Sequence, residues 1–184
     1  MELCKNVTVR FGDKTVLQDV TLRVPEKKVT WLSGPSGVGK TTLLRVLAGL
    51  VKPQTGEVTL PGRGVMLFQE DRLFPRLPAL DQVRAVLPRQ RRGEAVKWLE
   101  LVGLDQAAAL PPGKLSGGMA RRVALARALA VEGEVYLLDE PFAGVDLERA
   151  GHILTRLKDL GRTVVVTGHE GQLAHRCDHS VELN

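Results

Sequence analysis

Aromatic residues and cysteine are scarce in this chain of 184 residues. Phe, Trp and Tyr together account for only 4% of it, so the core must be built mainly from aliphatic side chains. The two cysteines, Cys4 and Cys177, lie at opposite ends and lack the close spacing of metal ligands. We expect both to be reduced thiols of a cytoplasmic protein rather than parts of a disulfide framework.

A long apolar run is absent too. The longest segment without Asp, Glu, Lys or Arg covers only residues 29–39, far short of the roughly 20 apolar residues that a membrane-spanning helix needs. The N-terminus has no apolar segment of the kind found in secretion signals, so we expect no such signal. With 43% hydrophobic and 26% charged residues, the composition is that of a globular protein. We expect a single domain, residues 1–184.

The formal net charge is +5, which fits an anionic partner or simply a soluble surface. The densest basic stretch is residues 84–97. It is either a solvated helix face or a surface that contacts acidic lipid headgroups or a membrane subunit. We expect no nucleic-acid partner.

Hydrophobic periodicity and turn residues predict an α/β protein. Strands that alternate with helices in the last third indicate a parallel sheet covered on both faces, and the first third reads as strands joined by tight turns. Strands are predicted at residues 7–11, 16–24, 29–33, 57–60, 65–68, 135–138 and 163–167, and helices at 40–50, 79–86, 93–102, 117–131 and 148–160.

A glycine-rich motif lies between the predicted strand 29–33 and the predicted helix 40–50, and it matches the phosphate-binding loop G-x-x-x-x-G-K-[ST]. Its glycines let successive N–H groups point at phosphate oxygens, and the helix N-terminus adds positive potential. Lys40 can reach the β- and γ-phosphates, and the Thr41 hydroxyl can bind Mg²⁺. A chance glycine-rich turn would not need this strand and helix context. The predicted nucleotide-binding residues are Gly34, Pro35, Ser36, Gly37, Val38, Gly39, Lys40, Thr41 and Thr42.

Two carboxylates end the predicted strand 135–138. In phosphate-loop proteins this end of a neighbouring strand faces the nucleotide. Asp139 is therefore predicted to hold Mg²⁺, directly or through water. Glu140 is predicted to activate the attacking water as general base. Without the phosphate loop, a solvated strand end would explain the pair equally well.

Residues 115–119, Leu-Ser-Gly-Gly-Met, precede the predicted helix 117–131. They resemble the signature motif of ABC (ATP-binding cassette) ATPases, usually Leu-Ser-Gly-Gly-Gln. Ser116, Gly117 and Gly118 form a second turn that can grip a γ-phosphate with a hydroxyl and a helix N-terminus. A single triphosphate does not need two phosphate-binding turns from the same chain. The resemblance implies that the motif serves the nucleotide held by a partner subunit.

Four further residues match landmarks of the same family in the expected order. Gln69 resembles the Q-loop glutamine, which implies contact with Mg²⁺ and the attacking water, and His169 resembles the switch histidine at the γ-phosphate. Asp146 resembles the end of the D-loop at the dimer interface, and Phe11 lies where the family stacks a ring on adenine. Each one alone would also fit a structural residue.

The resemblance covers nearly the whole chain and implies a phosphate-loop NTPase fold. That fold has a mostly parallel sheet flanked by helices, an antiparallel β region near the N-terminus and a small helical subdomain. The nucleotide-binding core is expected at about residues 1–69 and 132–184. The helical subdomain with the signature motif is expected at about residues 70–131.

The function that the resemblance implies is that of the ATP-hydrolysing subunit of an ABC transporter, with ATP and Mg²⁺ as cofactors. The implied partners are a second copy, in an ATP-dependent head-to-tail homodimer, and a separate transmembrane permease. The subunit is then cytoplasmic and peripheral on the inner face of the membrane. The short separate cassette is most similar to prokaryotic importer subunits without a regulatory domain.

Three motifs depart from the family pattern. Met119 replaces the usual glutamine, and residues 143–146 and 168–170 match loosely. No departure removes a group that must touch phosphate, so we expect activity. Three other functions share parts of the pattern: a small-molecule kinase, an ABC ATPase outside transport, and a regulator that barely hydrolyses ATP. The signature motif argues against the first, the absence of tandem cassettes against the second, and Glu140 against the third.

Overall fold

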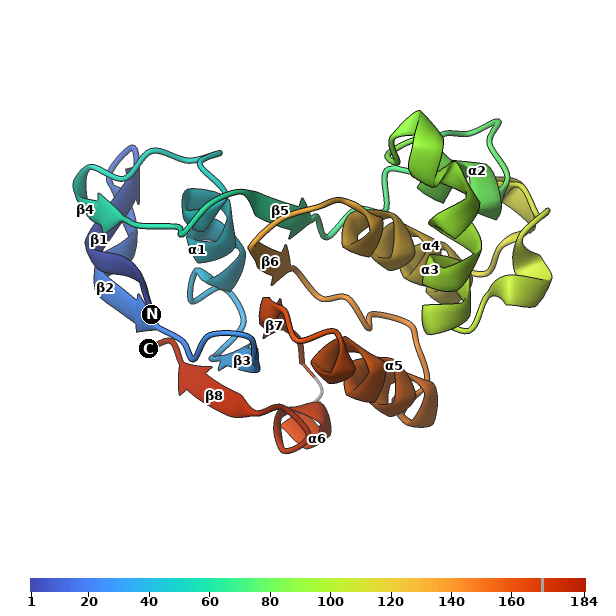
Figure 1. Cartoon of the computed structure of the whole chain (residues 1–184). Helices are drawn as coiled ribbons and strands as arrows, with labels where there is room; N and C mark the ends of the chain where they lie inside the picture. Colours follow the sequence, from blue (N-terminus) through green and yellow to red (C-terminus); the bar gives the residue numbers. More distant parts are fainter. Residues whose placement is uncertain (170) are drawn as a thin grey trace.

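A parallel sheet of five strands forms the centre of the computed structural model, which describes residues 1–169 and 171–184 (Figure 1). The strand order is β5-β6-β7-β3-β8, and each neighbouring pair is parallel. The three inner strands are buried almost throughout, as expected of a parallel sheet covered on both faces. The strands are β3 (Val29–Ser33), β5 (Gly64–Leu67), β6 (Val135–Leu138), β7 (Thr163–Thr167) and β8 (His179–Glu182).

A second sheet is antiparallel and has the order β2-β1-β4. Its strands are β1 (Glu2–Phe11), β2 (Lys14–Arg23) and β4 (Thr55–Val58). The first strand starts earlier than predicted because register shifts break its alternation, and Asn6 has a φ of 51°. Each of the four residues of β4 is exposed, which explains why apolar spacing placed this strand two residues too late.

The helices lie on both faces of the parallel sheet (Figure 1). Three run against it: α1 (Lys40–Leu47), α4 (Gly117–Ala130) and α5 (Leu147–Asp159). The shorter ones are α2 (Ala79–Arg84), α3 (Ala95–Leu101) and α6 (Gly171–Ala174), with 3₁₀ turns η1 (Arg89–Glu94), η2 (Asp105–Ala107) and η3 (Pro112–Lys114). The predicted helix 40–50 ends early because Gly49 has a φ of 72°, the left-handed conformation that terminates helices.

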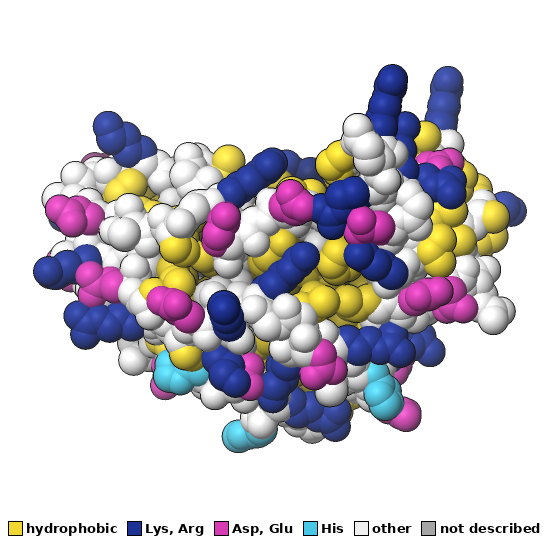
Figure 2. Space-filling view, viewed as in Figure 1, with side chains coloured by type: hydrophobic (Ala, Val, Ile, Leu, Met, Phe, Trp, Pro, Cys, Tyr) yellow, Lys and Arg dark blue, Asp and Glu magenta, His cyan; other side chains and the backbone are white. Residues whose placement is uncertain are grey.

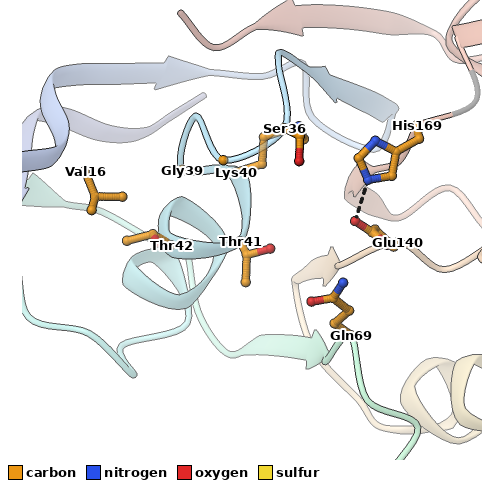
Figure 3. Close-up of a pocket in the computed structure, with 10 residues that line it drawn as sticks. Val16, Ser36, Gly39, Lys40, Thr41, Thr42, Gln69, Glu140 and His169 are labelled. Carbon is orange, nitrogen blue, oxygen red and sulfur yellow. Dashed lines mark hydrogen bonds and ion pairs between the residues drawn. The ribbon is translucent and has the colours of Figure 1, made fainter.

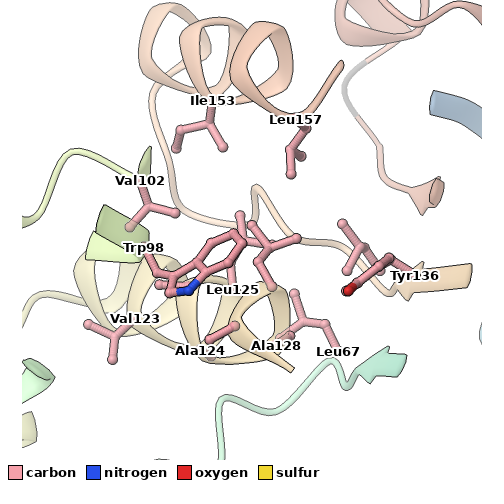
Figure 4. Packing of buried hydrophobic residues seen from close by; sticks show 14 of the residues in the cluster. Leu67, Trp98, Val102, Val123, Ala124, Leu125, Ala128, Tyr136, Ile153 and Leu157 are labelled. Carbon is pink, nitrogen blue, oxygen red and sulfur yellow. The ribbon is translucent and has the colours of Figure 1, made fainter. Parts of the chain in front are cut away.

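Alternate residues of β6 belong to different apolar clusters. Val135 and Leu137 pack with α1 and the antiparallel sheet. Tyr136 and Leu138 pack with α3, α4 and α5, around Trp98 (Figure 4). This period of two is what a strand covered on both sides requires. The α/β, phosphate-loop class with a mostly parallel sheet and an antiparallel N-terminal region is therefore confirmed.

The strand β8 and the helix α6 were not predicted. Three of the four residues of β8 are exposed and one is half-buried, so the segment has no apolar alternation. It is held by backbone pairing with β3. Such a strand is defined by its neighbour and not by its own side chains.

Basic residues of the stretch 84–97 lie over α2, η1 and α3, among acidic side chains (Figure 2). Arg91 and Lys97 both bind Glu94, and these hydrogen bonds lower the pKa of that carboxyl to about 2. Arg84 pairs with Asp81 in the same way. Among the described residues, no helix is long and apolar enough to cross a membrane.

Candidate functional site

The glycine-rich loop runs from the end of β3 into α1. Gly34, Gly37 and Gly39 have φ values of 141°, 79° and 111°, which other residues rarely adopt. A Cβ at Gly34 would collide with the carbonyl oxygen of Leu183, and one at Gly39 would lie 2.6 Å from the side chain of Leu17. The loop thus needs glycine both for its own conformation and for its close approach to β2 and to the residue that follows β8.

A pocket of about 260 Å³ opens at this loop (Figure 3). Nine of its ten lining residues are predicted site residues, drawn from the loop and from the ends of β5, β6 and β7. The parallel sheet brings them together because the carboxyl ends of its strands meet at one edge. The lining comprises Val16, Ser36, Gly37, Gly39, Lys40, Thr41, Thr42, Gln69, Glu140 and His169.

Lys40 brings a buried positive charge to the pocket. Its side chain curls over the loop, and Nζ donates to the carbonyl oxygens of Gly34 at 2.7 Å and Pro35 at 3.0 Å. These neutral acceptors orient the ammonium without neutralising it. An incoming phosphate would compete for it with a full negative charge, which forms the stronger hydrogen bond.

Asp139 is the buried acidic group of the site, with 1% of its surface exposed. Its Oδ1 accepts from the hydroxyls of Thr41 at 3.1 Å and Thr167 at 2.8 Å, whereas Oδ2 is buried and has no hydrogen-bond partner among the described residues. A buried carboxylate oxygen that lacks a donor is costly unless a cation or water binds it. Carboxylate and hydroxyl oxygens are ligands that Mg²⁺ prefers, so Thr41 and Asp139 fit this ion.

Glu140 and His169 face each other at the edge of the pocket (Figure 3). Oε1 of Glu140 and Nε2 of His169 lie 2.9 Å apart. The backbone of Glu140 has a φ of 49°, a conformation that is uncommon outside glycine. Its N–H donates to Thr167 Oγ1 at 3.0 Å, which helps to hold this turn and point the carboxylate into the pocket.

The signature residues lie outside the pocket lining. Ser116 caps α4, and its Oγ accepts from the N–H of Met119 at 3.3 Å. Gly117 and Gly118 form the first turn of that helix. Asp146 caps α5 and accepts from the N–H of Arg149 at 2.9 Å, a structural contact that the sequence did not predict. Phe11 is 55% exposed at the end of β1, also outside the lining.

The signature turn packs closely on residues 143–146 of the same chain. A Cβ at Gly118 would collide with the carbonyl oxygen of Gly144, whereas one at Gly117 would meet no atom of the described residues within 4 Å. We expect Gly118→Ala to lower the free energy of unfolding by about 1–3 kcal/mol, the range for overpacking. For a chain of this length that lowers Tm by several degrees.

Gly117→Ala is the matched control, since it makes the same substitution at the adjacent position. Its Tm should stay unchanged or rise slightly, because alanine favours helices over glycine. Thermal unfolding of the two purified variants checks both expectations. Equal Tm values would contradict the close packing at Gly118.

Three residues that shape the site were not predicted. Val16 lines the pocket from β2, Thr167 binds the backbone of Glu140 and the carboxylate of Asp139, and Arg121 binds backbone oxygens at the ends of β5 and β6. The available signals were the threonine that ends β7 after three valines and an arginine in an Ala-rich helix. Glu170, part of the motif 168–170, lies outside the described residues.

Comparison with known proteins gives consistent matches. A family model described as "ABC transporter" matches residues 17–143. The intermembrane phospholipid transport system ATP-binding protein MlaF of Haemophilus influenzae is 38% identical, over 90% of this chain and 73% of that protein. The aliphatic sulfonates import ATP-binding protein SsuB 1 of Nocardia farcinica is 46% identical, over 94% of this chain and 71% of that protein.

A solved structure has the same fold. It is the dimeric, post-hydrolysis state of the ATP-binding cassette MJ0796 bound to ADP and Pi. It superposes with a TM-score of 0.86 at 30% identity, over 100% of this chain and 94% of that one.

Proposed function

This chain belongs to the ABC transporter family, and from that membership we propose how its own residues bind and hydrolyse ATP. It is the ATP-binding, ATP-hydrolysing subunit of a transporter. The small-molecule kinase is thereby excluded. The observation that carries the residue assignment is the pocket in which the loop, Gln69, Glu140 and His169 meet.

The loop residues 34–42 bind the phosphates of ATP. Backbone N–H groups and the α1 N-terminus supply partial positive charge, and Lys40 supplies a full one. Phe11, exposed at the end of β1, presents a ring on which adenine stacks.

Thr41 and Asp139 hold Mg²⁺, with the Gln69 amide oxygen as a further ligand. The buried Oδ2 of Asp139, which no described residue binds, supports this assignment. When bound, the ion neutralises phosphate charge. Within the described residues there is no cluster of three or more His, Cys, Asp or Glu side chains suited to a metal. A site made of one carboxylate, a hydroxyl and phosphate oxygens needs no such cluster.

Glu140 accepts the proton of the attacking water as general base. Thr167 fixes the backbone of Glu140, so the carboxylate keeps its orientation as the proton transfers. Gln69, which lies next to Glu140 in the pocket lining, orients the same water (Figure 3). His169 and Lys40 donate hydrogen bonds to the γ-phosphate, where charge redistributes during transfer.

Ser116, Gly117 and Gly118 complete the site of a second copy of this chain. Their place outside the pocket of their own chain supports a head-to-tail homodimer, in which each ATP lies between the loop of one copy and the signature turn of the other. Asp146 stands at the same interface, because Gly144 packs on Gly118. Hydrolysis then removes the bridging phosphate and lets the dimer open.

The single domain 1–184 consists of a nucleotide-binding core, about residues 1–69 and 132–184, and a helical subdomain at about 70–131. The subdomain transmits closure to a transmembrane permease. That partner places the subunit on the cytoplasmic face of the membrane, as a peripheral protein.

Phosphate release from ATP tests the proposed activity and its metal site together. Wild type should release phosphate with Mg²⁺, and chelation should abolish release. Asp139→Asn keeps the size of the side chain and an oxygen for Thr41 and Thr167. It should raise the Mg²⁺ concentration for half-maximal rate by about 10–100-fold, the range for disturbed metal shells.

The matched control is Asp105→Asn, the same substitution at an exposed position in η2. It should follow the wild-type Mg²⁺ curve. Absence of phosphate release from wild type would refute the activity, and identical Mg²⁺ curves for wild type and Asp139→Asn would refute the metal assignment alone.

A further inference from the structure

One buried arginine of α4 touches two strand ends at the pocket. Arg121 is 3% exposed and lies five positions after Ser116 in the chain. Its NH1 donates to the carbonyl oxygens of Phe68 at 2.7 Å and Gln69 at 3.0 Å, just beyond β5. Its Nε donates to the carbonyl oxygen of Glu140 at 2.9 Å, and NH2 donates to that of Asp139.

The contact with Glu140 matters because the backbone of that residue has an unfavourable conformation. Glu140 has a φ of 49°, which costs energy in a residue other than glycine. Thr167 holds its N–H and Arg121 holds its carbonyl oxygen. These two hydrogen bonds fix the peptide groups on both sides of the Cα from which the catalytic carboxylate extends.

The same helix also holds the segment that follows Gln69. Arg127 donates to the carbonyl oxygens of Asp71 at 2.7 Å and Arg72 at 2.9 Å. Arg121 adds an ion pair with Asp71 at 3.1 Å. The segment therefore moves with α4, while Arg121 alone of these two arginines also reaches the end of β6.

We infer that Arg121 is a positioning residue that ties the helix carrying Ser116 to the backbones of Gln69 and Glu140. Engagement of Ser116 by a partner's nucleotide then sets the place of the catalytic carboxylate through a rigid helix and one planar side chain. A guanidinium suits this role because its donors diverge in one plane and can serve both strand ends at once. The inference rests on the proposed ATPase function.

Arg121→Lys tests it, because lysine keeps the charge but offers a single nitrogen that cannot reach both strand ends. We expect kcat to fall by about 10–100-fold with KM for ATP within about two-fold, as a small displacement of a catalytic group causes. Arg162→Lys is the matched control. Arg162 ties the other end of α4 to β6, through Leu129 and Tyr136, away from the pocket. It should keep the wild-type kcat.

A double-mutant cycle separates positioning from loss of stability. In single-turnover measurements on Glu140→Gln, adding Arg121→Lys should change the residual rate by less than about two-fold, because its route of action is already removed. Three results would overturn the inference. Arg121→Lys could lower the rate by the same factor in the wild type and in Glu140→Gln, change only KM, or leave kcat unchanged. A wild type without turnover would overturn the proposed ATPase instead.

A second variant keeps the inference testable if Arg121→Lys does not fold, which the loss of a cooperative unfolding transition would show. Asp71→Asn alters only the half-buried end of the same network, where the Asp71 side chain is 29% exposed. It should lower kcat by about three-fold, since one charge-assisted hydrogen bond is weakened, with the same dependence on Glu140. A wild-type kcat for Asp71→Asn would then count against the network.

Discussion

Glu140→Gln is expected to bind ATP like the wild type and to hydrolyse it about 10²–10⁴-fold more slowly, the range for loss of a general base. Glutamine has the same shape but cannot accept the proton of the attacking water. The local structure should survive, because Thr167 and Arg121 hold backbone atoms of this residue and not its side chain. The amide can also replace the carboxylate as partner of His169 Nε2.

Steady-state phosphate release and calorimetric ATP binding measure the two halves of this expectation. Glu148→Gln is the matched control, because the side chain of Glu148 is 90% exposed at the start of α5. It should keep the wild-type rate. Wild-type turnover by Glu140→Gln would remove this residue from the catalytic role.

The same variant should show the dimer directly. Because hydrolysis is slow, ATP with Mg²⁺ should hold two copies together through the bridging γ-phosphate, and size-exclusion chromatography should show a monomer without ATP and a dimer with it. A protein that stays monomeric under both conditions, although it binds the added ATP, would mean that closure needs the membrane partner, or that Met119 and residues 143–146 weaken the interface.

Ser116→Arg is expected to abolish ATP hydrolysis while leaving ATP binding by the isolated chain unchanged. Ser116 lies outside the pocket lining, so a change there does not touch the nucleotide held by its own chain. In the head-to-tail dimer, however, the larger side chain fills the space for the partner's γ-phosphate. Hydrolysis should stop because the site no longer closes.

Complementation makes this result specific. Lys40→Ala should fail because it loses the loop ammonium, but its Ser116 is intact. A mixture of Lys40→Ala and Ser116→Arg forms some dimers with one site that has both Lys40 and Ser116. The mixture should therefore recover part of the wild-type rate, although each variant alone is inactive. Normal hydrolysis by Ser116→Arg, or no recovery on mixing, would contradict the shared site.

The residues that we propose to touch the nucleotide were open to sequence prediction. The loop 34–42, the pair Asp139 and Glu140, and the signature turn are contiguous motifs, and their chemistry depends on residue type and spacing within a few positions. Gln69 and His169 followed from the resemblance to the ABC family, whose landmarks occur in the same order along this chain. The parallel sheet then brought these segments to one edge, as its topology requires.

What the sequence by itself determined is therefore the fold class, the family and nine of the ten residues that line the pocket, because periodicity and short motifs are local properties of a chain. Only the tertiary structure decided how those groups are held. Thr167 and Arg121 lie 27 and 19 positions from Glu140, yet both bind its backbone. The exposed strand β8 likewise exists only because β3 pairs with it. Contacts between distant segments depend on how the chain packs, so no local pattern can specify them.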